Sequence, residues 1–152
     1  QGPGNLLRAT TSGTLTVGQP EIPIFTKKNI VGTVSQAAGV PTGEIIERGS
    51  NANGEYVRFA DGTQICTFAA TAASEAISVA FMGGFRSGVQ LWSFPASFIA
   101  PPSVTPTPTA LSAFGATASS VNNTGCSFAY TAVTSQVAAA RSASLVAVGR
   151  WF

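Results

Sequence analysis

Alternation of apolar and polar residues with a period of two is the main pattern along this chain. It is clearest at residues 55–60 and 63–68, two β-favouring runs separated by the dipeptide Asp61-Gly62. An Asp-Gly pair suits the two positive-φ positions of a type I′ turn, whose twist matches the flanking strands. We therefore predict a β-hairpin here, with Cys66 and Phe68 on one face of its second strand.

Other β-favouring runs are short and are separated by glycine, proline or polar turns. They predict strands in six further segments: residues 30–34, 77–81, 89–94, 103–105, 111–118 and 126–133. Residues 82–88 and 119–125 are expected to form loops, and proline excludes a helix from residues 95–109. Alternation places three sets of side chains on shared faces: Ile77, Val79 and Phe81; Trp92 and Phe94; and Cys126, Phe128, Tyr130 and Ala132.

Four segments are ambiguous at this level. Residues 69–76 are rich in alanine and are compatible with a helical turn, whereas residues 44–48 and 134–140 have no clear preference. Residues 141–152 fit either a helix or a strand, but a helix would place Arg141 within its apolar stripe. The β-rich C-terminal end therefore favours a strand.

Many short strands separated by Gly and Pro turns are typical of an antiparallel sandwich or barrel. We predict an all-β fold: an antiparallel β-sandwich over residues 49–152, preceded by an extended N-terminal arm over residues 1–48. Gly and Pro interrupt the arm repeatedly, which leaves room for one strand at residues 14–17. Pro23 cannot donate to a strand ladder and so suits an edge or an arm.

Charged residues are scarce, which changes what the surface of this fold is expected to do. They make up 9% of the 152 residues, against about 25% in a usual globular protein, and the mean hydropathy is +0.29. No apolar run approaches the roughly 18 residues needed to span a membrane. We infer that part of the surface is covered by copies of the chain or by a larger assembly. The alternative is that abundant alanine and glycine raise the mean hydropathy without creating an apolar surface.

Few residues offer catalytic or metal-binding chemistry. The chain has no histidine, so it lacks imidazole bases and the commonest metal ligand, and its cysteines lack a metal-binding spacing. The acidic residues do not form an evident catalytic pair of the kind that glycosidases use, and Asp61 is explained by its turn. We expect no enzymatic activity, cofactor or metal, with a polysaccharide depolymerase as the alternative class. The eight Lys and Arg residues form no basic patch, which argues against nucleic-acid binding.

The two cysteines, Cys66 and Cys126, are far apart in the sequence. They could pair only if facing strands bring their Cα atoms within about 7 Å. We expect instead two free, buried thiols and no disulfide. The chain begins at Gln1 without an initiator Met, which is typical of a processed product, an expressed fragment or a segment of a longer protein.

Four stretches resemble phage and prophage tail-fibre proteins. Residues 29–49, NIVGTVSQAAGVPTGEIIERG, resemble a linker of that family, and residues 50–66, SNANGEYVRFADGTQIC, resemble the segment that follows it. Residues 92–104, WSFPASFIAPPSV, are similar to the next family element, and residues 147–152, AVGRWF, to the closing strand. C-terminal domains of this family are similar to H-type lectins, small antiparallel β-sandwiches that form trimers and bind sugars near subunit boundaries. The resemblance implies a homotrimeric virion protein, displayed outward, that touches the host surface. It also implies that the arm over residues 1–48 serves attachment or trimerisation.

Sugar recognition requires an aromatic face together with polar groups on loops. Four residues are candidates for binding a glycan: Arg86, Asn122, Asn123 and Tyr130. Three aromatic residues are candidates for a subunit interface: Trp92, which is also a possible sugar platform, Trp151 and Phe152. Each set also has a simpler interpretation, since aromatic side chains often pack in a core and asparagines often serve a turn.

We expect a phage virion structural protein, a tail-fibre or spike domain on the tail or head, that binds a host-surface glycan. The alternative is a head spike, decoration protein or other virion component with no ligand of its own. The expected partners are two further copies of the chain and other virion structural proteins, which would contact residues 1–48. Neither nucleic-acid binding nor membrane insertion is expected.

Overall fold

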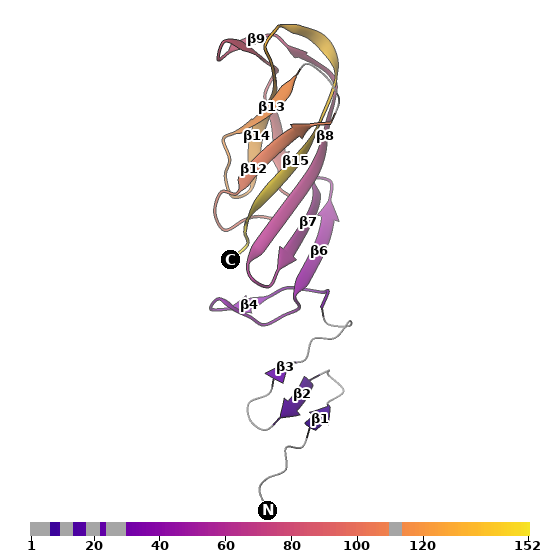
Figure 1. Ribbon diagram of the computed structural model, residues 1–152, viewed down its shortest axis with the longest axis vertical. Coiled ribbons are helices and arrows are strands. Elements are labelled where there is room, and N and C mark those ends of the chain that lie inside the picture. Colours follow the sequence, from indigo (N-terminus) through magenta and orange to yellow (C-terminus); the bar gives the residue numbers. More distant parts are fainter. Residues whose placement is uncertain (1–6, 10–13, 18–21, 24–29, 110–113) are drawn as a thin grey trace, which may run out of the picture.

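The computed structural model describes residues 30–109 and 114–152 in full, and the backbone of residues 7–9, 14–17 and 22–23. Within these residues every regular element is a β-strand. The described part of the chain contains no helix that is long and apolar enough to cross a membrane. The predicted all-β fold is confirmed, because two antiparallel five-stranded sheets form a sandwich (Figure 1). A small sheet and a short hairpin precede the sandwich in the chain.

The first sheet of the sandwich, called here the long sheet, has the strand order β12-β15-β8-β7-β6. Its strands are β12 (Ser103–Pro108), β15 (Gln136–Arg150), β8 (Thr63–Ile77), β7 (Gly54–Phe59) and β6 (Ile46–Asn51). The strands β8 and β15 have 15 residues each and pair with one another from end to end. At about 3.3 Å per residue they form a ribbon roughly 50 Å long, which gives the sandwich its elongated shape (Figure 1).

The second sheet, called here the short sheet, is built around its central strand β14 (Gly125–Ala132). The other strands are β11 (Gln90–Ser93), β10 (Gly84–Arg86), β9 (Val79–Phe81) and β13 (Gly115–Ser119). One edge of β14 pairs with β11 along its first half and with β10 at its last two residues, whereas β13 pairs along the other edge. β9 extends this sheet beyond β10.

The N-terminal segment contains more strand than the sequence predicts. Where one strand is expected, β1 (Leu7–Ala9), β2 (Thr14–Val17) and β3 (Ile22–Pro23) form a separate antiparallel sheet, with β3 as an edge strand. The hairpin of β4 (Gln36–Ala37) and β5 (Val40–Pro41) follows. Figure 1 shows β1–β3 at one end of the molecule and β9 at the other, which we call the distal end. The boundary expected between residues 48 and 49 lies inside β6.

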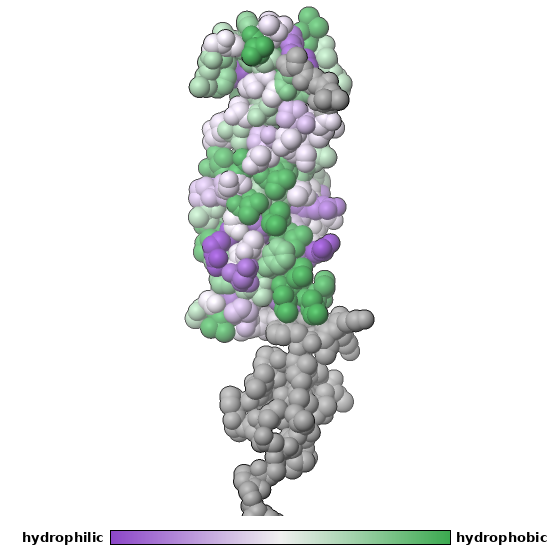
Figure 2. All heavy atoms as spheres, viewed as in Figure 1, coloured by the Kyte–Doolittle hydropathy of each residue, from purple (hydrophilic) through white to green (hydrophobic). Residues whose placement is uncertain are grey.

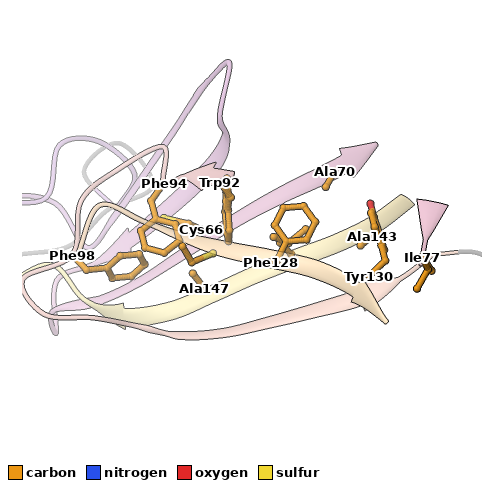
Figure 3. Packing of buried hydrophobic residues seen from close by; sticks show 12 residues of the cluster. Cys66, Ala70, Ile77, Trp92, Phe94, Phe98, Phe128, Tyr130, Ala143 and Ala147 are labelled. Carbon is orange, nitrogen blue, oxygen red and sulfur yellow. The ribbon is translucent and has the colours of Figure 1, made fainter. Parts of the chain in front are cut away.

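The core lies between the two sheets and matches small residues on one sheet with large ones on the other (Figure 3). The long sheet contributes mainly small side chains, those of Cys66, Ala70, Ala143, Leu145 and Ala147. The short sheet contributes large ones, those of Trp92, Phe128 and Tyr130, with Phe94 and Phe98 from the following loop. Large side chains opposite small ones allow the two sheets to pack closely, as protein interiors do. It confirms the shared faces predicted for Trp92 with Phe94 and for Cys126 with Phe128 and Tyr130.

The helical turn allowed for residues 69–76 is wrong, because this segment continues β8 without interruption. Residues 136–140, which have no preference in the sequence, belong to β15. Each segment is the pairing partner of the other, although the register shifts on both sides of Ala139. The hydrogen bonds of this ladder override the weak helical preference of alanine, since strand formation depends strongly on tertiary context.

The hairpin at β7 and β8 is confirmed, but its turn is not of type I′. Of the predicted pair only Gly62 has a positive φ, at 93°. The loop has three residues, 60–62, and Gly62 N donates to the Phe59 carbonyl at 3.0 Å, as in a type I turn followed by a bulge. Two positive φ values in succession occur instead at the turns Ala38-Gly39 and Met82-Gly83.

Three other predicted segments differ from the structure. Residues 30–34 form no strand and contribute only an isolated bridge between Val31 and Ile46. Residues 77–81 are divided between the two sheets, so that Ile77 is fully buried while Val79 and Phe81 are exposed. The predicted loop at residues 82–88 contains β10, since Met82-Gly83 is a tight turn that reverses the chain into it.

Candidate functional site

A pocket of about 630 Å³ lies at the distal end, where the β9–β10 hairpin meets the end of β14 and the start of β13. Its lining residues include Phe81, Met82, Phe85, Phe114, Thr117 and Thr131, of which Phe85 and Phe114 turn their rings toward the core. None of its lining residues is charged. Its volume is within the range of about 300–1,000 Å³ that is typical of small-ligand sites. We call it the distal pocket.

Glycines and a strained turn shape this pocket. A Cβ atom on Gly84 would lie 2.6 Å from the carbonyl oxygen of Ala132, so glycine is what allows β10 to approach β14 this closely. The turn at Met82-Gly83 has φ values of 49° and 79°. A positive φ is uncommon for a residue with a side chain, and the Met82 side chain is also 90% exposed. The turn therefore holds a large apolar side chain in solvent at the edge of the pocket.

Two threonine hydroxyls add polar groups to an otherwise apolar wall. Thr131 pairs with Gly115, and Thr117 pairs with Ala129, so both side chains lie on the same face of the short sheet. Neither hydroxyl has a side-chain hydrogen bond to the part of the chain that the structure describes. Both hydroxyls are therefore available to a ligand.

The four predicted glycan-binding residues do not form one site. Arg86 pairs with Thr131 beside the distal pocket, and its Nη1 donates to the Ser87 carbonyl at 3.0 Å. Asn122 and Asn123 precede the other end of β14, roughly 20 Å away at the usual strand rise. The Asn122 side-chain oxygen accepts bonds from the backbone of Thr124 and Gly125, as in an ordinary turn.

The prediction that Tyr130 contacts a glycan is not supported by its position, because its side chain is fully buried in the core. Its ring lies edge-to-face with Phe114 at 5.5 Å and with Phe128 at 5.9 Å. Burial also raises the pKa of its hydroxyl above the ordinary value of 10.0. Within this chain Tyr130 therefore packs the interior and presents no face to a ligand.

The three aromatic residues predicted at a subunit interface have different environments. Trp92 is 2% exposed, and its indole Nε1 donates to the Asn53 carbonyl at 2.9 Å, so it is a core residue rather than an interface residue. Trp151 and Phe152 are half-buried and lie edge-to-face at 4.5 Å. The Arg58 guanidinium lies 5.6 Å from the Trp151 ring, which closes this end of the sandwich.

The Arg58 side chain also belongs to a polar network at the end of the sandwich far from the pocket. Its Nε donates to Gln64 Oε1 at 2.8 Å, and its Nη1 lies 3.6 Å from the Glu47 carboxylate. The same carboxylate accepts a hydrogen bond from the Tyr56 hydroxyl at 2.8 Å, which raises the pKa of Tyr56. Glu47 further accepts a bond from Val34 N, so the network fixes the segment before β6 onto the sandwich.

The outer face of the long sheet is the second candidate surface. On β8, β12 and β15 the residues facing away from the core are small or β-branched and uncharged from one end of β12 to the other: Ile65, Thr67, Ala69, Thr71, Ser103, Thr105, Thr107, Ser142, Ser144, Val146 and Val148. Figure 2 shows mostly apolar or neutral residues on the visible face, with strongly hydrophilic ones in a few places. We call this surface the uncharged face.

The two cysteines are both free and buried. Burial raises the pKa of the Cys126 thiol from 9.0 to about 11, and it raises the pKa of Cys66 as well. The folded protein thus keeps the Cys126 proton over a pH range in which the unfolded chain releases it.

We expect the free energy of unfolding to fall as the pH rises from about 9 to 11, by about 2 kcal/mol for Cys126. Below pH 9 both states hold this proton, so Cys126 adds no pH dependence there. Urea unfolding at a series of pH values would measure the effect, and Cys126→Ala should flatten the curve over this range. Parallel curves for the variant and the unmodified chain would contradict this account.

The residues of the distal pocket were not singled out by sequence reasoning. Phe81 and Phe85 lie on either side of the Met82-Gly83 turn, but the sequence suggested a flexible loop for residues 82–88. The available signal was a bulky apolar residue before a double glycine, which suits a tight hairpin that leaves the side chain exposed. Phe114 and Thr131 come from distant segments, and only the pairing of β13 with β14 brings them together.

Comparison with known proteins gives a fold and no family. No protein-family model matches the chain, and no curated protein matches it. Among solved structures, the P. aeruginosa R1 pyocin fibre comprising C-terminal residues 323–701 aligns with 70% of this chain, at 18% identity and a TM-score of 0.50. An N-truncated R1-type pyocin tail fibre also aligns with 70% of this chain and with 88% of its own, at 17% identity and a TM-score of 0.47.

The aligned region covers 29% of the first of these fibres, so this chain corresponds to a fraction of its length. At 18% identity the likeness concerns the fold and not the ligand or the partners. The resemblance to tail fibres that the sequence indicates is thus supported at the level of architecture. The chain has a tail-fibre-like β-sandwich fold.

Proposed function

We propose that this protein is a structural component of a phage tail or a pyocin-like particle, displayed at the particle surface as part of a fibre. The observation that carries the proposal is the similarity of its fold to the R1 pyocin fibre. The elongated shape agrees with this role, because the N-terminal sheet and the distal pocket lie at opposite ends (Figure 1). The N-terminal segment would contact other structural proteins, and the distal end would face the host. The structural comparisons give no support to a location on the head of a phage particle.

We propose that the working unit is a homotrimer that uses the uncharged face. A soluble protein rarely leaves a large surface without charges, and the cores of subunit interfaces are depleted of them. The described charges near this face lie at its borders: Glu55 and Arg48 on β7 and β6, beyond β8, and Arg150 at the end of β15. Two further copies of the chain would cover the face and leave the charged rim in water.

The third part of the proposal is that the trimer binds a host-surface glycan and has no enzymatic activity. The distal pocket supports it, with Arg86 beside the pocket as the one predicted glycan residue near it. Asn122 and Asn123 would form a separate and weaker contact at the other end of β14. A virion component without a ligand is the second candidate function. It is favoured by the involvement of Asn122 in its own turn and by the burial of Tyr130.

Two measurements test these proposals. Light scattering on the purified chain at micromolar concentration should give three times the 15.4 kDa mass of one chain. A density map of intact particles should place the chain in a tail appendage, with residues 1–48 against another structural protein. A mass of one chain would refute the trimer, and a map that places the chain inside the particle would refute the display role.

A further inference from the structure

We infer that the distal pocket binds an uncharged saccharide through the apolar face of its sugar ring. This inference rests on the proposed function and adds to it a site and a ligand class. This pocket is not the glycan site that the sequence suggested, because only Arg86 of the four predicted glycan-binding residues lies near it.

The exposed side chains of Phe81 and Met82 form the apolar part of the pocket that a ligand can reach. Phe81 pairs with Gly84, so its ring lies on the same outer face of the short sheet as Thr117 and Thr131, whereas the rings of Phe85 and Phe114 face the core. The negative face of a phenyl ring attracts the weakly positive C–H groups on one face of a sugar ring. An exposed ring of this kind beside hydroxyl groups therefore suits a flat ligand with C–H groups on its face and hydroxyls at its edge.

The threonine hydroxyls suit the edge of that ligand. Thr117 and Thr131 lie on the same face of the short sheet, and neither has a side-chain partner in the described chain. A hydroxyl can donate and accept, so these two match the donor and acceptor character of sugar hydroxyls. A purely apolar ligand would leave both hydroxyls unpaired, which costs binding free energy.

The charges around the pocket argue for a neutral ligand. Neither of the two nearby guanidinium groups lines the pocket: Arg141 donates to the carbonyls of Glu75 and Val137, and Arg86, beside Thr131, uses one of its N–H groups for the Ser87 carbonyl. The Arg141 guanidinium also lies 4.9 Å from the centre of the Phe114 ring and is 8% exposed. A charged sugar in the pocket would lose its hydration without gaining an ionic partner among the lining residues, which is unfavourable.

The experiment is an array of neutral, acidic and amino saccharides, probed with the full chain. Saturation-transfer NMR then compares methyl galactoside with galacturonic acid and galactosamine, which share a ring and differ in charge. We expect glycans with neutral terminal residues to bind, and each charged counterpart to bind at least tenfold more weakly. Phe81→Ala and Thr131→Val should each weaken binding about tenfold. Ile99→Ala, at an exposed apolar side chain on the opposite end, should not change it.

Each outcome decides the inference. Loss of binding in both pocket variants, with no change in the control, supports it. It is overturned if acidic or amino sugars bind best, if glycan binding survives both pocket substitutions, or if no saccharide binds. In all three cases a tail appendage in the particle map would leave the proposed structural role intact, whereas absence of the chain from the appendage would refute that role independently.

Discussion

Val148→Lys is expected to convert the proposed trimer into single chains without unfolding them. Val148 lies on the uncharged face, between Ser103 on β12 and Ile65 on β8, and is 44% exposed in the isolated chain. A lysine there points into solvent in the single chain but would be buried without a partner in the trimer. An unpaired buried charge costs several kcal/mol, so we expect association to weaken by roughly 100-fold or more.

The matched control is Val79→Lys, because Val79 is 45% exposed and belongs to the short sheet at the distal end. This variant should keep the mass of three chains by light scattering at the same concentration. Circular dichroism would confirm that both variants retain their strands. Dissociation of both variants, or of neither, would show that the uncharged face is not the contact between copies.

Trp92→Ala is expected to lower the free energy of unfolding by about 3–5 kcal/mol, which is the usual cost of removing a large buried aromatic side chain. Trp92 is 2% exposed and stands at the centre of the aromatic part of the core. Its ring stacks on Phe68 at 6.0 Å and meets Phe94 edge-to-face at 4.9 Å. The substitution would also leave the Asn53 carbonyl without the indole donor that ties the β6–β7 turn to the short sheet.

Two control variants separate the causes of this loss. Trp92→Phe keeps a ring and removes the hydrogen bond, so it should cost less than the alanine variant. Leu91→Ala alters the neighbouring residue, which is 79% exposed on the other face of β11, and should stay within about 0.5 kcal/mol of the unmodified chain. Urea unfolding at one fixed chain concentration would measure all three, because the proposed assembly would make stability depend on concentration. Equal losses for Trp92→Ala and Leu91→Ala would contradict the core assignment.

The course of several strands could be predicted from local sequence because alternation is a local property. The run from Cys126 to Tyr130 has a buried residue at every second position, and the sequence alone shows this. The last strand could be predicted as well, because a helix would have placed Arg141 in its apolar stripe. Arg141 is in fact buried in β15, where backbone carbonyls accept its hydrogen bonds and Phe114 lies against its guanidinium.

The environments of Tyr130 and Trp92 could not be predicted from the sequence. Each is an aromatic residue of the type that often forms a sugar-binding platform or a subunit contact, but each is buried in the core. A single sequence shows that an aromatic residue lies on the apolar face of a strand. It does not show whether that face meets the other sheet, a ligand or another chain.

The sequence by itself determined that the chain is all-β, that it reverses at Asp61-Gly62, and that its surface is poor in charge. These properties depend on the order of neighbouring residues and on composition. The tertiary structure decided that the alanine-rich segments of β8 and β15 are strands, and that Phe81, Phe114 and Thr131 line one pocket. The physical reason is that both features come from pairing between segments far apart in the chain, whose hydrogen bonds and contacts outweigh weak local preferences.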